Sequence, residues 1–204
     1  MVRITKNKEV RKNELIDTAM QLFIKKGYEQ TSVSDIVKEI NVAQGTFYYH
    51  FESKTDILEA VGEKLIDQII NKIRQIANRK KIDETERLDD IIDYFSMFYN
   101  TSKEIVDNIH SESNIILHQK LAKKTLAKLL PVLTNIIEEG VAKGRFNVTY
   151  PAENAEFLIL AMTEMLHNPE TMTNADRRER VRFTIEENLK KILGTEDYKF
   201  DLKI

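Results

Sequence analysis

One stretch of this 204-residue chain decides how the rest is interpreted: residues 31–58, which read TSVSDIVKEINVAQGTFYYHFESKTDIL. Its first half places apolar residues at helical spacing over 33–40, after a Ser-x-x-Asp capping signal. Asn41 follows, and after glycine asparagine is the residue that most readily adopts the left-handed conformation of a helix end. A second short helix is predicted over 44–51, so the stretch predicts two helices joined by a tight turn.

The second of these helices has two chemically different faces. Phe47 and Phe51 are four residues apart, lie on one side and belong in a core. The other side carries five polar, small or aromatic residues: Gln44, Gly45, Thr46, Tyr48 and Tyr49. A helix of this kind after a tight turn is the geometry of a helix-turn-helix, whose second helix enters the major groove of DNA.

The residue types on this face suit contacts with DNA. Gln44 can pair with adenine through two hydrogen bonds, Thr46 can contact a thymine methyl group, and Gly45 lets the backbone approach. Four further side chains can reach phosphates: Tyr48, Tyr49, His50 and Lys54. The alternative for each tyrosine alone is an ordinary half-buried aromatic residue, and the alternative for His50 is a structural role. The prediction therefore depends on the whole set.

These residues resemble the DNA-binding domain of TetR-family transcriptional regulators. The resemblance covers about residues 10–60, includes the segment 23–28, and depends above all on GTFYYHF at 45–51 followed by Lys54. It implies DNA contacts for eight residues: Thr31, Gln44, Gly45, Thr46, Tyr48, Tyr49, His50 and Lys54. Two positions depart from the family pattern, because Asn41 replaces a glycine of the turn and Ala43 replaces a serine that would cap the second helix.

The composition favours helices throughout the chain. Six glycines and three prolines leave few tight turns. Apolar spacing predicts further helices over 15–23, 57–76, 88–98, 103–109, 115–142, 152–167 and 174–193. We therefore expect an all-α protein. The resemblance divides it into a three-helix helix-turn-helix domain over residues 1–54 and a helical-bundle domain for ligand binding and dimerisation over residues 55–204.

Composition and motifs also exclude several classes. The chain has no cysteine, so disulfide frameworks, thiolate metal sites and cysteine nucleophiles are excluded. No apolar run approaches the roughly 20 residues of a membrane span, and no apolar signal segment follows the start. Phosphate-binding glycine loops and the H-E-x-x-H and G-x-S-x-G motifs are missing. We expect a cytoplasmic protein that is not an enzyme and has no metal, cofactor or membrane partner.

The first twelve residues are strongly basic, although the whole chain carries 31 basic and 33 acidic residues. The basic residues of this segment are Arg3, Lys6, Lys8, Arg11 and Lys12. Such a segment forms an arm over the DNA backbone or minor groove, or is simply a solvated terminus.

The last two predicted helices indicate how copies of the chain associate. Residues 157–162 are apolar on every face, which a helix sustains only when it is covered on all sides. The final helix supplies a matching stripe: Val181, Ile185, Leu189, Ile192 and Leu193. Together with the resemblance, this predicts a homodimer through helices near 152–167 and 174–193, bound to a palindromic operator in double-stranded DNA. The alternative is that these residues form the core of a monomeric bundle.

The resemblance further implies a small-molecule effector bound within the bundle. Candidate lining residues are aromatic, methionine or polar: Tyr94, Met97, Phe98, Ile109, His110, Asn114, His118, Phe157 and Met165. The alternative for each is ordinary core packing. We thus expect a ligand-responsive repressor that its effector releases from DNA. The alternative is an architectural or partner-recruited DNA-binding module without a ligand.

Overall fold

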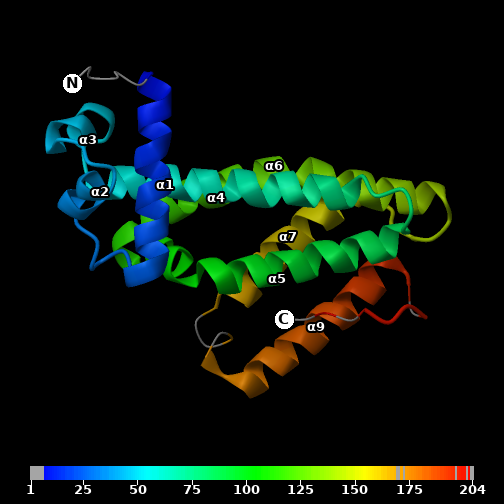
Figure 1. The fold of residues 1–204 in the computed structure, drawn as a ribbon. Coiled ribbons are helices and arrows are strands. Elements are labelled where there is room, and N and C mark those ends of the chain that lie inside the picture. The colour runs from blue at the N-terminus through cyan, green and yellow to red at the C-terminus, as the bar shows by residue number, and fades with distance from the viewer. Residues whose placement is uncertain (1–6, 169–170, 172, 196, 201, 203–204) are drawn as a thin grey trace. The chain divides into compact units, whose positions relative to one another are not determined.

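The computed structural model describes residues 7–168, 171, 173–195, 197–200 and 202, and every regular element in that part of the chain is helical (Figure 1). The elements are α1 (Lys8–Lys26), α2 (Val33–Glu39), α3 (Gln44–His50), α4 (Lys54–Ala77), α5 (Glu84–Ile109), a 3₁₀ turn (Glu112–Asn114), α6 (Ile115–Ala142), α7 (Pro151–His167) and α9 (Ala175–Leu193). The predicted all-α class is confirmed. Among the described residues no helix is both long and apolar enough to cross a membrane.

The packing divides the chain into two compact units. The first contains the residues up to Asp67 together with Ser102–Leu121, and the second contains Gln68–Thr101 together with the residues from Ala122 onward. Because α4, α5 and α6 each contribute to both units, packing alone does not mark a functional boundary. The division of function between residues 1–54 and 55–204 stays a prediction.

The first unit begins with three helices whose ends follow the predicted signals. Gly27 ends α1 with φ 86°, a conformation that L side chains rarely adopt. Ser32 and Asp35 form a reciprocal capping box at the start of α2, with the Asp35 amide donating to Ser32 Oγ at 3.1 Å. Asn41 adopts the expected left-handed conformation, with φ 53°. Helix α1 packs against α2, and α2 packs against α3.

The core of the first unit is built from the apolar faces of these helices. The buried side chains are Leu15, Ala19 and Phe23 of α1, Ile36 and Val37 of α2, Phe47 of α3, Phe51, and Ile57, Leu58 and Val61 of α4. Phe23 and Tyr28 pack edge to face with ring centroids 5.1 Å apart. Burial of these residues holds the short helices α2 and α3, which would be marginal alone.

Helix α5 is one continuous helix, so the prediction of separate helices over 88–98 and 103–109 was wrong. The polar residues between the two apolar stripes remain helical. Thr101 Oγ1 donates to the Phe98 carbonyl at 2.9 Å. The Ser102 side chain is buried. The Thr101 hydroxyl is therefore satisfied inside the helix, and neither residue ends it.

The second unit contains a buried ionic cluster near the start of α5 and the end of α6. Arg87 donates to Glu84 Oε1 at 2.5 Å and to Glu139 Oε2 at 2.8 Å. Lys143 Nζ and Arg145 Nε approach the Glu84 carboxylate at 2.6 and 2.9 Å. The side chains of Arg87 and Glu84 are almost completely buried. Removing one partner would weaken the compensation of a buried charge, although the other ion pairs of the cluster remain.

These contacts lower the pKa values of both carboxyl groups. Burial raises the pKa of Glu84, but hydrogen bonds from Lys143 and Arg87 outweigh it, so the net shift is downward from 4.5. The pKa of Glu139 is also lowered, chiefly by its hydrogen bond from Arg87. A lowered folded-state pKa contributes stability that is present above the ordinary value and is lost as the pH falls through the folded value.

We predict that Arg87→Met lowers the free energy of unfolding by about 1.5 to 3 kcal/mol at pH 7, because the buried Glu84 loses one of its three cationic partners. The measurement is urea unfolding followed by circular dichroism at constant protein concentration. Arg79→Met is the control, since Arg79 pairs with Asp90 at the surface and should contribute less than about 1 kcal/mol. The difference between wild type and Arg87→Met should narrow below pH 4.5. Equal losses in the two variants would contradict the prediction.

Candidate nucleic-acid interface

Helix α3 presents one face to solvent because its opposite face is anchored in the core. Phe47 and Phe51 are buried with ring centroids 5.6 Å apart. Tyr48 and Tyr49, which point the other way, are 55% and 67% exposed. Such exposure is uncommon for large aromatic side chains, which normally gain most from burial. The outer face of α3 is thus a surface suited to a partner.

The start of α3 is open in the way that a DNA-reading helix requires. Gln44 is exposed at the first helical position, and Thr46 is half-buried behind it. A Cβ atom added at Gly45 would meet no atom within 4 Å. Ala43 makes no side-chain capping bond, as expected, so the free N–H groups of the first turn remain available to an acceptor.

Basic residues of α1 lie next to α3. Lys8 Nζ is 5.0 Å from the centroid of the Tyr49 ring, and Lys12 Nζ is 5.8 Å from that of Phe51. The sequence placed these lysines in an N-terminal arm, whereas both are part of the helix. Arg11 pairs with Glu14 at 2.7 Å, and the arm residues Arg3 and Lys6 lie outside the described residues. The lysines add positive charge beside the exposed tyrosines.

His50 is half-buried at the end of α3. Burial lowers its pKa from 6.5, and the charges of Lys8 and Lys12 lower it further. Its ring packs edge to face on Tyr49, with centroids 4.9 Å apart. His50 is therefore mainly neutral at pH 7 and can donate or accept one hydrogen bond without adding a charge.

Two of the predicted contact residues are directed into the protein. Thr31 is 1% exposed, and its hydroxyl donates to the Gly27 carbonyl at 2.8 Å. Lys54 Nζ donates to the Tyr28 carbonyl at 3.0 Å and lies 4.2 Å from the centroid of the Tyr28 ring. Both residues therefore hold the loop between α1 and α2.

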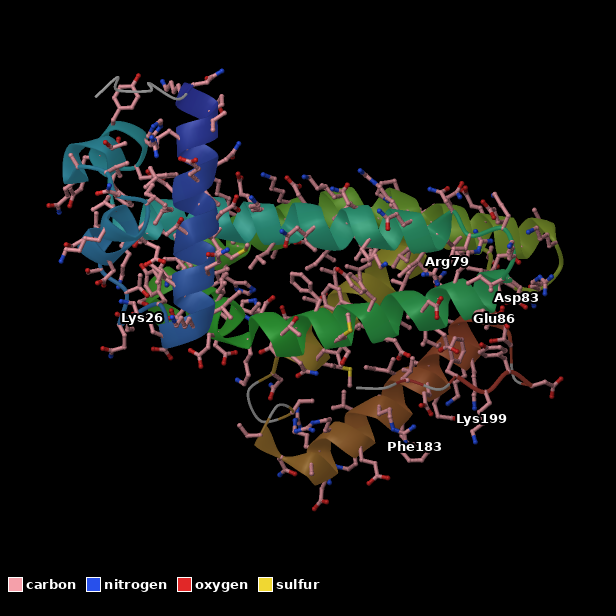
Figure 2. All side chains as sticks on the ribbon, in the orientation of Figure 1. Lys26, Arg79, Asp83, Glu86, Phe183 and Lys199 are labelled. Atoms are coloured by element: carbon pink, nitrogen blue, oxygen red, sulfur yellow. The ribbon has the colours of Figure 1, made fainter. Side chains whose placement is uncertain are left out.

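Lys26 lies at the end of α1 (Figure 2). It joins α1 to the start of α2, with Lys26 Nζ 2.8 Å from Asp35 Oδ2. The hydrogen bond from Lys26 lowers the pKa of Asp35 most, followed by those from Ser32. Asp35 thus caps α2 and binds α1 at once. The sequence indicated only the first of these roles, because a contact between helices has no signature in the spacing within either one.

The second unit encloses a cavity of about 50 Å³. We call it the effector cavity, after the role that we propose for it. Apolar residues of five helices form most of its wall, among them Ile73, Leu88, Leu129, Leu158, Met162 and Leu189. None of the residues predicted for the effector site lines it. The sequence prediction favoured aromatic and polar residues, whereas these aliphatic ones were indistinguishable from ordinary core residues.

The residues predicted for the effector site divide between the two units. In the second unit Met97 and Phe157 are exposed, whereas Tyr94, Phe98 and Met165 are half-buried. In the first unit His110 and His118 stack edge to face with centroids 4.3 Å apart, and Asn114 donates to the Asn108 carbonyl at 2.8 Å. Burial of His110 and the neighbouring His118 lower the pKa of His110 to about 4. Their part in ligand binding stays a prediction.

Helices α7 and α9 pack against each other and carry exposed apolar residues. Phe157 and Leu160 of α7 are 57% and 50% exposed, and Phe183 of α9 is 52% exposed and points away from the ribbon (Figure 2). Leu158 and Ile159, from the same apolar run, are buried. The run that is apolar on every face therefore covers the core with one side and leaves the other in solvent.

The described fold and the outer face of α3 define a helix-turn-helix DNA-binding regulator. Residues 15–61 match the family described as "Bacterial regulatory proteins, tetR family", and residues 97–179 match "Tetracyclin repressor-like, C-terminal domain". The chain is 30% identical over 141 residues to the fatty acid metabolism regulator protein of Bacillus subtilis, which covers 68% of this chain and 72% of that protein. The chain belongs to the TetR family of transcriptional regulators.

Two further relatives are also named as regulators. The biofilm operon icaADBC negative transcriptional regulator IcaR of Staphylococcus aureus is 33% identical over 124 residues, covering 55% of this chain and 66% of that protein. The solved structure of the fatty acid degradation regulator FadR from Bacillus halodurans has a TM-score of 0.65 and 26% identity, covering 93% of this chain and 98% of that one. These relatives are named as regulators and not as enzymes.

We predict that Lys54→Gln lowers the thermal stability of the DNA-free protein, because the ammonium group is hydrogen-bonded to backbone carbonyls of the loop before α2. The expected loss is about 1 to 2 kcal/mol, measured by thermal unfolding. Lys38→Gln, on the exposed surface of α2, is the control and should change stability by less than about 0.5 kcal/mol. If Lys54→Gln keeps full stability but reduces the salt dependence of DNA binding, Lys54 contacts phosphate directly.

Proposed function

We propose that this regulator is a repressor that binds a palindromic operator as a homodimer and is released from it by a small apolar effector. The observation that carries the proposal is the outer face of α3, where polar and aromatic side chains are exposed, while Phe47 and Phe51 are buried on the opposite side. We infer that it acts on DNA in the cytoplasm. Membership of the TetR family supports a role as a DNA-binding regulator, and the relative IcaR is named as a negative regulator.

In this proposal the residues of α3 have different roles in DNA recognition. Gln44 and Thr46 contact base edges, and Gly45 allows close approach of the backbone. Tyr48, Tyr49 and His50 bind phosphates and fix the register, and Lys8 adds a charge beside them. Thr31 and Lys54 act by holding the preceding loop, so their effect on DNA is indirect.

The proposed dimer forms through α7 and α9. Their exposed phenylalanine and leucine side chains would be covered by the same surface of a second copy, which is how a two-fold interface is built. Two recognition helices related by this symmetry would then read two half-sites about 34 to 36 Å apart, or farther if the operator is longer.

The proposed effector binds in the effector cavity of the second unit. The apolar wall favours an apolar ligand, because each buried methylene contributes about 0.8 kcal/mol. The effector reduces DNA affinity by binding more tightly to the arrangement of the dimer that fits the operator poorly. Two relatives named for fatty acid metabolism and degradation are consistent with a ligand of this kind.

Gly45→Ala tests the role of α3 with little risk to the fold. A methyl group at this position meets open space, and alanine favours a helix over glycine by about 0.5 to 1 kcal/mol, so thermal stability should not fall. We predict that operator affinity falls at least about tenfold, or 1.4 kcal/mol, because the methyl group enters the space where the backbone meets DNA. The operator is first selected from genomic DNA, and affinity is measured by fluorescence anisotropy.

Gln44→Ala is the companion variant in the same assay. It should relax the preference at one base pair of each half-site by about 1 to 3 kcal/mol and leave the others intact. Unchanged affinity in Gly45→Ala, together with equal losses on all operator variants in Gln44→Ala, would contradict direct reading by α3.

Phe157→Glu tests the dimer. We predict that the purified protein sediments as a dimer and that the variant shifts toward monomer, because a carboxylate on the apolar face of α7 opposes its burial. Ile116→Glu is the matched control, since Ile116 is an exposed apolar residue of α6 outside the proposed interface. A monomeric wild type, or equal dissociation of both variants, would refute the interface.

A further inference from the structure

Two lysines of α1 are held beside the end of α3 by aromatic rings. Lys8 and Lys12 are four residues apart, so they share one face of α1. Lys8 Nζ lies 5.0 Å from the centroid of the Tyr49 ring, and Lys12 Nζ lies 5.8 Å from that of Phe51. These cation–π contacts favour one position for each flexible lysine side chain. Lys8, Lys12 and His50 together are called the basic cluster below.

His50 is flanked by the same two aromatic rings. Its ring packs edge to face on Tyr49 with centroids 4.9 Å apart, and it lies tilted against Phe51 with centroids 6.4 Å apart. Because Tyr49 contacts Lys8 and Phe51 contacts Lys12, the imidazole and both ammonium groups gather around one pair of rings. The His50 side chain is half-buried, so part of its ring remains accessible to a ligand.

The surroundings of His50 oppose a positive charge on its ring in the free protein. Burial lowers its pKa most, and the nearby cations lower it further, whereas one carboxylate acts in the opposite direction. The charged groups behind these shifts belong to α1: Lys8, Lys12, Arg11 and the carboxylate of Glu9. An imidazole in this position gains a proton readily only when a further negative charge arrives.

A phosphate of the DNA backbone supplies such a charge. A phosphodiester is an anion across the physiological pH range, and it binds ammonium and imidazolium groups through charge-assisted hydrogen bonds. It would offset the repulsion among the three cations and favour the protonated imidazole, in which both ring nitrogens are donors. The proposed function places His50 at the DNA backbone, where a phosphate is available.

We propose that the basic cluster is one site for a backbone phosphate of DNA and that His50 is protonated in the complex, so that each half-site takes up a proton from solvent on binding. This inference rests on the proposed function, because it takes α3 as the recognition helix. Lys8 and Lys12 supply permanent charges, and His50 supplies a charge that depends on the bound phosphate. Operator binding therefore responds to pH.

The direction of the response follows from the two states of His50. Its pKa is lowered from 6.5 in the free protein and rises in the complex, because the phosphate favours the charged ring. Such a group strengthens binding as the pH falls through the pKa of the complex, and it adds nothing more below the pKa of the free protein. For a dimer with two such sites, we expect operator affinity to rise at least about fivefold from pH 8 to pH 6.

The test uses the full-length protein without effector and the operator duplex selected from genomic DNA. Fluorescence anisotropy gives the affinity from pH 8 to pH 6, and calorimetry in buffers of different ionisation enthalpy counts the protons taken up. Wild type should show the rise in affinity together with net proton uptake. His50→Gln should reduce the change in affinity to within about twofold and abolish the uptake, because the amide does not titrate.

His50→Arg separates the charge of this residue from a structural role of its ring. The variant carries a cation at every pH, so it should bind the operator more tightly than His50→Gln at pH 8 and gain nothing at pH 6. It is the decisive variant if His50→Gln does not fold. A pH response of wild-type size in either variant would overturn the proposal, as would a smaller rise than expected or no proton uptake in wild type.

The salt dependence of binding tests the two lysines of the basic cluster. Lys8→Gln and Lys12→Gln should each lower the slope of log affinity against log salt concentration by about one unit for each half-site. Lys25→Gln is the matched control, since Lys25 is exposed in the last turn of α1, and it should keep both the slope and the pH response. Unchanged slopes in both Lys8→Gln and Lys12→Gln would remove the lysines from the site.

A parallel titration with a random-sequence duplex separates this inference from the proposed function. If the operator is bound specifically but without a pH response, operator recognition stands and the phosphate site fails. If no operator can be selected and the random duplex still binds with the expected dependence on His50, the phosphate site stands and sequence-specific repression fails.

Discussion

The burial of Phe47 and Phe51 is the constraint on which the DNA-binding surface depends. Helix α3 has seven residues and is too short to be stable alone. Its position is fixed because these two rings, four residues apart, fill the core of the first unit. Once they are buried, helical geometry directs Gln44, Tyr48 and Tyr49 outward. The exposed side chains of α3 are therefore held in position by packing on the opposite side of the same helix.

Polar contacts around α2 complete this arrangement. Asp35 caps α2 and pairs with Lys26, while Lys54 binds the backbone of the loop after α1 and packs on the Tyr28 ring. The Lys26–Asp35 pair joins α1 to α2, and the Lys54 contact joins α4 to the loop after α1. Lys54 is a residue of the recognisable motif whose ammonium group has carbonyl acceptors inside the protein.

The second unit has a different organisation, with polar and apolar regions kept apart. The ionic cluster around Arg87 satisfies the buried charges near the ends of α5 and α6, whereas the effector cavity has an almost entirely aliphatic wall. Charges that are paired in this way do not compete for a ligand. The exposed side of α7 is a further apolar surface of this unit.

The sequence by itself determined the helical class, the capping of α2, the left-handed turn at Asn41 and the inward side of α3, because these features depend on neighbours within a few residues. It also indicated the family, through the run from Gly45 to Phe51. Tertiary structure decided what depends on distant residues. It made α5 continuous through Thr101, turned Thr31 and Lys54 inward and set Lys8 beside Tyr49. It also enclosed a cavity lined mainly by aliphatic residues. An aliphatic residue that lines a cavity has the same spacing along its helix as one that fills a core, and only the packing of several helices distinguishes them.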